Sequence, residues 1–176
     1  MSVLEKIKKK IALIINRSSK PVMYEKRNLP TKVKSSDTRI SSTTFIDHPE
    51  NLSIGENVFI GQFNFIEASN HIRIDEGCQI TNYVTITTHS SHDSIRLYGR
   101  DYKTQQNHIG YQKGPVKIGA YTYVGPYSIL NPGTETGQGC LIRAHSVMKG
   151  KYPDFSIIGG NPATVLGDTR NRDRKY

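Results

Sequence analysis

The chain is poor in cysteine and has no long hydrophobic run. It contains two cysteines, Cys78 and Cys140, and no cysteine spacing typical of a metal site. Both lie within repeat segments, so we expect small core or corner residues in a reducing compartment. No segment approaches the roughly 18 apolar residues that span a bilayer. The apolar run over residues 11–15, preceded by basic residues, is too short for a secretory signal.

Acidic residues are also scarce, with 15 Asp and Glu against 24 Lys and Arg and a net charge of +9. Residues 1–36 carry ten basic and two acidic side chains, and residues 168–176 carry four and two. The body between them has a net charge of −1 and contains no motif for binding RNA or DNA. The basic character therefore belongs to the termini, and we expect no nucleic-acid partner.

What the chain does have is a six-residue repeat. Over residues 118–148 every sixth residue is aliphatic with one exception, and glycine follows several of them: Ile118, Val124, Leu130, Thr136, Ile142 and Met148, with Gly119, Gly125 and Gly137. An earlier run has a two-residue slip in its middle: Ile54, Ile60, Ile66, Ile74, Ile80 and Ile86. A period of six fits neither a helix nor an alternating strand.

A short fixed period predicts a solenoid. We expect an all-β coil of triangular section in which each repeat forms one short strand and a corner. The aliphatic residue points inward, and the glycine after it allows a positive φ and a close approach of backbones. About four coils provide a continuous core, because repeats bury their apolar faces against their neighbours. The coil domain is predicted over residues 41–167, after a helix and connector (1–40) and before a basic tail (168–176).

Two segments depart from the repeat. Residues 2–16 read as an amphipathic helix with Ser2 as a candidate N-cap and with lysines outside its apolar stripe. It could dock on its own subunit or a neighbour, or it could bind an anionic membrane surface. Residues 90–115 form a long polar loop, predicted to be functional. Its planar and cationic side chains suit a saccharide: Arg96, Tyr98, Arg100, Tyr102, Lys103 and Tyr111.

The run VKIGAYTYVGPYSILNPGTETGQGCLIRAHSV, followed by YPDFSIIGGNPATVL, resembles the last coils and exit of the hexapeptide-repeat acyltransferases. The resemblance covers roughly residues 46–167 and is to the sugar O-acetyltransferase branch, which includes maltose and galactoside acetyltransferases. It implies a left-handed parallel β-helix, a homotrimer with active sites between subunits, and a cytoplasmic location. It also implies acetyl-CoA as the acetyl donor, a saccharide acceptor and no metal.

The resemblance also implies the catalytic base. His89 follows the repeat strand that carries Ile86, directly ahead of the loop, and matches the family's catalytic histidine. His92 is the alternative. Such an imidazole would accept the proton of a sugar hydroxyl as the oxygen attacks the thioester, and would then return it to the leaving thiolate. No Ser or Cys dyad is evident, so direct transfer is expected, with backbone N–H groups holding the oxyanion.

Binding residues are carried over position by position. Gln62 and Asn64 resemble the family's acceptor-binding segment, although the family has Asn where Gln62 stands, and Asn64 could instead bridge coils. The donor positions that match are Tyr123, Gly125, Ala144, Ser146, Lys149 and Lys151. Arg143 and His145 stand where the family commonly has glycine. These two departures narrow the donor groove or add charge to it.

Three other functions remain open at this point. The first is N-acetylation of an amino sugar attached to a nucleotide. The second is a metal-dependent hydratase of the carbonic-anhydrase type on the same coil, which needs three histidines at an interface, where His89 and His92 supply two. The third is a non-catalytic structural solenoid, which the loop and the position of His89 disfavour.

Overall fold

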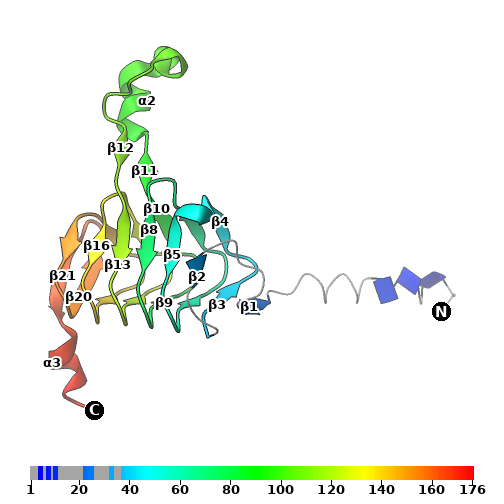
Figure 1. Ribbon diagram of the computed structural model, residues 1–176, viewed down its shortest axis with the longest axis vertical. Coiled ribbons are helices and arrows are strands. Elements are labelled where there is room, and N and C mark those ends of the chain that lie inside the picture. Colours follow the sequence, from blue (N-terminus) through cyan, green and yellow to red (C-terminus); the bar gives the residue numbers. More distant parts are fainter. Residues whose placement is uncertain (1–3, 6, 9, 12–21, 26–31, 34–36) are drawn as a thin grey trace.

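The chain winds as a three-sided coil of short parallel strands, with one excursion that stands out from its side (Figure 1). The computed structural model describes residues 4–5, 7–8, 10–11, 22–25, 32–33 and 37–176. From β3 onward, successive strands pass in turn through an eight-stranded, a five-stranded and a six-stranded sheet. Each strand pairs in parallel with the equivalent strand of the next coil. Only the outer strands β1 and β21 pair antiparallel in these sheets of the described chain.

The strands are two to six residues long. The eight-stranded sheet contains β1 (Met23–Glu25), β3 (Arg39–Ser41), β6 (Phe59–Ile60), β9 (Gln79–Ile80), β14 (Tyr123–Val124), β17 (Leu141–Ile142), β20 (Ser156–Gly160) and β21 (Ala163–Asp168). The five-stranded sheet contains β4 (Phe45–Asp47), β7 (Phe65–Glu67), β10 (Thr85–Thr87), β15 (Ile129–Leu130) and β18 (Val147–Met148). The six-stranded sheet contains β2 (Lys32–Val33), β5 (Leu52–Ile54), β8 (Ile72–Ile74), β13 (Val116–Ile118), β16 (Glu135–Thr136) and β19 (Lys151–Tyr152).

The repeat residues form the core, as predicted. All twelve are at most 1% exposed. Equivalent residues stack from coil to coil, for example Ile86 between Ile66 and Leu130. The exception to the aliphatic rule, Thr136, is also buried, and its hydroxyl accepts a hydrogen bond from the backbone N–H of Gly119 (3.2 Å). Burial of this column supplies the main stabilisation of the coil.

The glycines that follow the repeat residues allow neighbouring coils to approach closely. The prediction that these glycines have a positive φ is wrong. A Cβ on Gly119 would lie 2.4 Å from the backbone carbon of Gly137, and one on Gly125 would lie 2.5 Å from the backbone nitrogen of Ala144. Positive φ falls instead at other corner positions, several of them aromatic: Phe63, Tyr83, Tyr121, Tyr127, His145 and Phe155. The glycines are therefore required because neighbouring backbones leave no room for a side chain.

The two-residue slip lies at one edge of the coil. Ile46 and Ile54 are eight positions apart, as are Ile66 and Ile74, and both extra pairs fall where the chain passes from the five-stranded to the six-stranded sheet. A short 3-10 helix, η1 (Pro49–Asn51), forms in the first of these corners. We call this corner, at residues 47–51, 67–71, 88–115, 131–134 and 149–150, the His89 edge.

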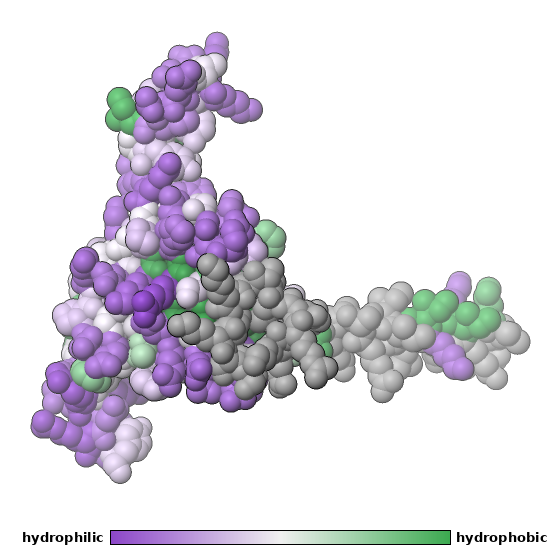
Figure 2. Space-filling model, viewed as in Figure 1, coloured by the Kyte–Doolittle hydropathy of each residue, from purple (hydrophilic) through white to green (hydrophobic). Residues whose placement is uncertain are grey.

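The excursion leaves the same edge between β10 and β13. A two-stranded antiparallel stalk, β11 (His89–Ser90) and β12 (Gln112–Lys113), carries a knob of residues 91–111 (Figure 1). The knob contains the helix α2 (His92–Tyr98) and the 3-10 helix η2 (Gly99–Thr104). The predicted loop is thus an ordered projection with its own helix. Figure 2 shows its surface as mainly hydrophilic.

The ends of the chain differ in part from the expectation. β2 and β3 already pair with β5 and β6, so the coil begins before residue 41. A short helix, α3 (Thr169–Asp173), lies in the basic tail. Most of the predicted helix over residues 2–16 lies outside the described residues, and that helix stays a prediction, as does the left-handed sense of the coil. No helix in the described ranges has the length and hydrophobicity needed to span a bilayer.

Candidate active site

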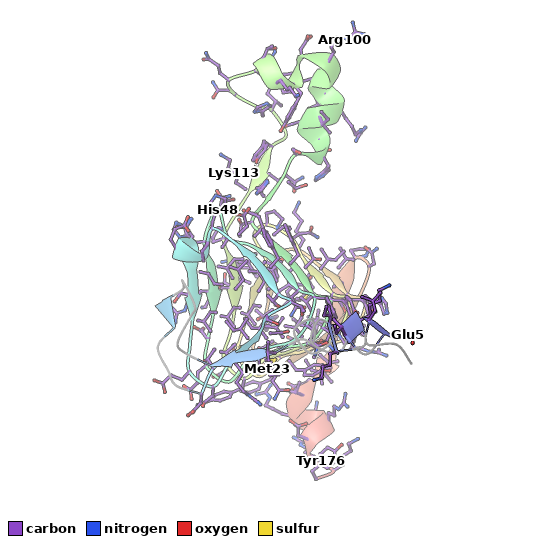
Figure 3. All side chains as sticks on the ribbon, turned by 90° about the vertical axis from the view of Figure 1, so that its right-hand side faces the viewer. Glu5, Met23, His48, Arg100, Lys113 and Tyr176 are labelled. Carbon is purple, nitrogen blue, oxygen red and sulfur yellow. The ribbon has the colours of Figure 1, made fainter. Side chains whose placement is uncertain are left out.

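His89 is held between the coil and the stalk. It is the first residue of β11, two positions after β10, and it pairs across the stalk with Lys113. Its side chain is 37% exposed. Figure 3 shows Lys113 and His48 near each other where the stalk leaves the coil, with Arg100 at the far tip of the knob. A rigid strand thus positions the imidazole while part of the ring faces solvent.

A buried carboxylate lies behind the histidine. Glu67 ends β7 one coil below Thr87, and its side chain is 4% exposed. Its Oε2 lies 2.8 Å from Nδ1 of His89, and the hydroxyl of Ser69 lies 3.3 Å from the same nitrogen. Because an anionic acceptor faces Nδ1, the proton of the neutral ring resides there. Nε2 is then the nitrogen that can accept a proton.

The surroundings of Glu67 keep it ionised. Burial alone would raise the pKa of Glu67, but hydrogen bonds from Ser69 and Thr88 outweigh it and lower the pKa to about 2. The backbone N–H of Ser69 donates to Oε1 (2.7 Å), and the N–H and hydroxyl of Thr88 both donate to Oε2 (3.0 Å each). A negative charge therefore faces Nδ1 of His89 throughout the neutral range.

The prediction from sequence missed Glu67. The signal was present, because a coil length of 20 residues aligns Glu67 with Thr87 and places it next to His89.

An aromatic ring covers one face of the imidazole. Tyr111 stacks on His89 with ring centroids 5.7 Å apart and ring planes 3° apart. Burial chiefly raises the pKa of Tyr111, with Tyr102 and Glu67 adding to the shift, so its phenol stays neutral.

His92 has a different environment. Its Nδ1 lies 2.7 Å from the hydroxyl of Ser90, and its Nε2 lies 3.3 Å from the Gln112 amide and 3.4 Å from Asp93. Both ring nitrogens thus have partners, and the side chain is 57% exposed. Among the described residues His89 alone has a buried carboxylate at Nδ1 and a ring nitrogen with no recorded partner. The geometry favours His89 as the base.

Among the described residues, one group of side chains could hold a metal ion. Donor atoms of Asp47, His48 and Glu67 lie within 4.8 Å of one another. The fit is poor, because both oxygens of Glu67 already accept hydrogen bonds and Oε2 also faces His89. The group contains one histidine, so a hydratase site with three histidines is not assembled within this described chain.

The predicted acceptor residues lie on another edge. Gln62 and Asn64 are in the corners between the eight-stranded and the five-stranded sheet, residues 42–44, 61–64, 81–84, 125–128 and 143–146, which we call the aromatic edge. Asn64 is buried, and its amide donates to the Gly61 carbonyl (3.1 Å) and accepts from the Val84 N–H (2.7 Å). This favours the coil-bridging alternative for Asn64. Gln62 is only partly buried.

The predicted donor residues divide between the two edges. Gly125, Ala144 and Ser146 lie on the aromatic edge, where Ser146 points inward and donates to the Arg143 carbonyl (2.6 Å). Tyr123 lies on the outer face of the adjoining sheet and is 40% exposed. Lys149 belongs to the His89 edge, where its Nζ donates to Gln112 of the stalk (2.8 Å). Lys151 pairs with Glu135 (3.1 Å) on the six-stranded sheet.

An aromatic stack runs along the aromatic edge. Phe63, Tyr83, Tyr127 and His145 stack in order, with centroid distances of 5.2, 4.9 and 5.1 Å. His145, one of the two departures from the family pattern, is thus the last ring of this stack. The five-stranded sheet, with strands of two or three residues, separates the two edges by roughly 10 Å within one chain.

The loop residues predicted to bind saccharide are also divided. Tyr102 and Tyr111 line one pocket, described below. Tyr98 is tied into the knob by a hydrogen bond from its hydroxyl to the Asn107 carbonyl (3.1 Å). Arg96 pairs with Asp93 (3.7 Å), and Arg100 and Lys103 are exposed.

Comparison with known proteins gives relatives of one kind. No protein-family model matches the chain. A galactoside O-acetyltransferase from Escherichia coli is 24% identical over 139 residues, 78% of this chain and 64% of that protein. A probable acetyltransferase from Mycobacterium tuberculosis is 42% identical over 57 residues, 32% of this chain and 19% of that protein. This chain thus spans less than two thirds of the length of either relative.

Solved structures show the fold. A galactoside acetyltransferase in complex with coenzyme A has a TM-score of 0.63 at 21% identity, over 76% of this chain and 62% of that chain. AntD, an N-acyltransferase from Bacillus cereus in complex with dTDP and 3-hydroxybutyryl-CoA, has a TM-score of 0.63 at 18% identity, over 82% and 90%. The relatives and neighbours are acetyltransferases and acyltransferases, and this chain has their fold.

Proposed function

We propose that this chain is an acetyl-CoA-dependent O-acetyltransferase that acts on a sugar hydroxyl of a surface polysaccharide, such as a capsule or O-antigen, or of its precursor. The observation that carries the proposal is the pairing of Glu67 with Nδ1 of His89 at the base of the stalk. The names of the relatives support the donor, because the galactoside acetyltransferase structure holds coenzyme A.

The chemistry follows from the orientation of His89. Nε2 accepts the proton of the sugar hydroxyl as the hydroxyl oxygen bonds to the carbonyl carbon of the acetyl thioester. The resulting tetrahedral oxyanion collapses, the carbon–sulfur bond breaks, and the imidazolium returns its proton to the thiolate of coenzyme A. The Glu67 carboxylate stabilises the imidazolium between these two steps. General-base catalysis of this kind contributes roughly 10²- to 10⁴-fold.

The site is proposed to lie between chains of a homotrimer. Within one chain His89 and the proposed donor positions Gly125 and Ala144 lie on different edges, which supports a site shared between chains. In a closed trimer the His89 edge of one chain would face the aromatic edge of the next. The outer face of the five-stranded sheet offers a row for such contact that is apolar except for one threonine: Phe45, Phe65, Thr85, Ile129 and Val147.

We also place the protein in the cytoplasm, where acetyl-CoA is available, with the N-terminal segment as a further contact to membrane or protein. Residues 1–18 carry five basic side chains, and the apolar residues Leu4, Ile7 and Ile11 are exposed in this chain. A lipid-linked saccharide precursor at the membrane surface would suit both features.

The test is an acceptor screen with the purified protein. Calorimetry should show binding of coenzyme A, and release of its thiol from acetyl-CoA should depend on a saccharide acceptor. The screen needs two sets of acceptors, sugars with hydroxyl groups only and amino sugars. The alignment with the N-acyltransferase AntD covers 90% of that chain, which supports N-acylation of a nucleotide-linked amino sugar as the second candidate. Thiol release with hydroxyl-only sugars supports O-acetylation. Release only with amino sugars, lost when the amine is blocked, would replace it by N-acetylation.

A further inference from the structure

The knob contains a pocket next to the candidate base. The pocket has a volume of about 500 Å³ and is lined by Tyr102, Gln106, Asn107, His108, Tyr111 and Lys113. Two of these residues also belong to the surroundings of His89, since Tyr111 stacks on its ring and Lys113 pairs with it across the stalk. The pocket is therefore a continuation of the site along the stalk.

Rings line the way from the base into the pocket. Tyr111 lies 5.7 Å from His89 and 6.0 Å from His108, and His108 lies 4.4 Å from Tyr102, all between ring centroids. The rings of Tyr111 and His108 are tilted by 41° to each other, so neither ring covers the face of the other by stacking. Lys113 adds an ammonium group 5.3 Å from the centre of the Tyr111 ring.

Hydrogen bonds within the knob hold the pocket in a preformed shape. His108 Nε2 lies 2.8 Å from the Tyr102 carbonyl oxygen, which holds the imidazole against the η2 segment. The Tyr98 hydroxyl donates to the Asn107 carbonyl and accepts from the N–H of Ile109 (3.0 Å). The hydroxyl of the buried Ser94 donates to the Ile109 carbonyl (2.6 Å). These bonds fix residues 107–109 to α2, so binding requires little ordering of the loop.

The lining is suited to a sugar ring. The C–H groups of a pyranose carry partial positive charge and pack on the negative face of an aromatic ring. Side-chain amides such as Gln106 and Asn107 both donate and accept hydrogen bonds, as hydroxyl groups require. No acidic residue lines the pocket. The volume is within the range of ordinary small-ligand sites.

We propose that this knob pocket binds a second sugar unit of the acceptor, so that the substrate is an oligosaccharide or polysaccharide and not a free monosaccharide. The inference rests on the proposed function, because the first sugar unit is the one placed at His89. The second unit lies over Tyr111 and against Tyr102, and the glycan continues outward along the knob.

The test compares acceptors of different length. Acetyl transfer is measured with galactose against lactose and with glucose against maltotriose and cellotriose, for the wild type and for Tyr102→Ala and Asn107→Ala. Ile95→Ala is the matched control, because Ile95 is an exposed residue of α2 in the same knob and does not line the pocket. Binding of the same oligosaccharides is followed separately by saturation-transfer NMR, which needs no acetyl transfer.

We expect the wild type to have a higher kcat/KM for the longer acceptors. Each pocket variant should lower that preference about fivefold to tenfold, as for the loss of one aromatic contact or hydrogen bond, and Ile95→Ala should keep it. Equal kcat/KM for both lengths, or a preference that the pocket variants leave unchanged, overturns the inference while the proposed function stands. NMR binding lost in Tyr102→Ala, without thiol release from any hydroxyl acceptor, supports the pocket and contradicts the proposed function.

Discussion

Among single residues, Glu67 has the most unusual environment. A glutamate in the wall of an apolar coil is costly unless its charge is compensated, and here Ser69, Thr88 and His89 surround the carboxylate. The same contacts that stabilise the charge also set the tautomer of His89. A residue that looks like an interruption of the repeat is thus the one that distinguishes His89 from His92.

This environment predicts a pH dependence of stability. The pKa of Glu67 is about 2 in the folded chain, below the ordinary glutamate value of 4.5. Because the pKa is lowered on folding, the ionised carboxylate of Glu67 stabilises the fold. This stabilisation is fully present above pH 4.5 and is lost as the pH falls toward 2. It is on the order of 3 kcal/mol at neutral pH. Glu67→Gln should lack this component when the free energy of unfolding is measured by urea titration.

The difference between the wild type and Glu67→Gln should therefore be largest at neutral pH and should shrink in acid. Asp75→Asn is a suitable control, since Asp75 pairs with Arg73 on a more exposed part of the surface. If the difference is the same at pH 7 and in acid, the native charge of Glu67 is not the source of the stabilisation.

At the scale of the elements, corner glycines decide whether coils can stack. Gly119→Ala would place a Cβ 2.4 Å from the backbone of Gly137, where no flexible side chain can move aside. We expect a loss of about 1–3 kcal/mol in the free energy of unfolding. The matched control is Gly167→Ala in the outer strand β21, where the nearest atom is the Cδ1 of Ile157 at 3.7 Å. Equal losses in the two variants would show that the close approach is not limiting.

The N-terminal segment provides a second test at this scale. Deleting residues 1–18 removes five of the basic residues and the apolar run. If the segment is a membrane contact, the deletion should leave acetyl transfer to soluble acceptors intact and abolish binding to anionic vesicles. Binding of the full chain should weaken as salt rises. If the truncated protein is insoluble or its oligomer dissociates, the segment is a packing element.

For the whole molecule, the six-residue period was enough to predict the coil, its core and the excursion. The twelve repeat residues from Ile54 to Met148 all point inward, as predicted. Burial in a solenoid depends on local spacing alone, so the sequence is enough to predict it. The details of the site depend on contacts between coils. Glu67 and His89 are 22 positions apart, and their meeting follows from a coil of 20 residues, which the two-residue slip indicates and the period of six alone does not. Asn64 was ambiguous for the same reason, since its partners lie on two different coils.

The proposed trimer makes a prediction of its own. His89→Ala removes the base from one edge, and Ala144→Trp would fill the opposite edge, so each homotrimer should be inactive. When the two variants are unfolded together and reassembled, about a quarter of the sites should combine intact edges from two chains. Thiol release should return in the mixture. Mixed oligomers, verified by mass, that remain inactive would contradict a shared site, as would a fully active monomer.

The most direct measurement is the rate of acetyl transfer by His89→Ala compared with His92→Ala. We expect His89→Ala to lower kcat by about 10²-fold or more, because the base acts in the transition state. Binding of coenzyme A and the thermal unfolding temperature should stay close to those of the wild type, and His92→Ala should be mild. A nearly active His89→Ala variant, or a larger loss in His92→Ala, would contradict the assignment of His89 as the base.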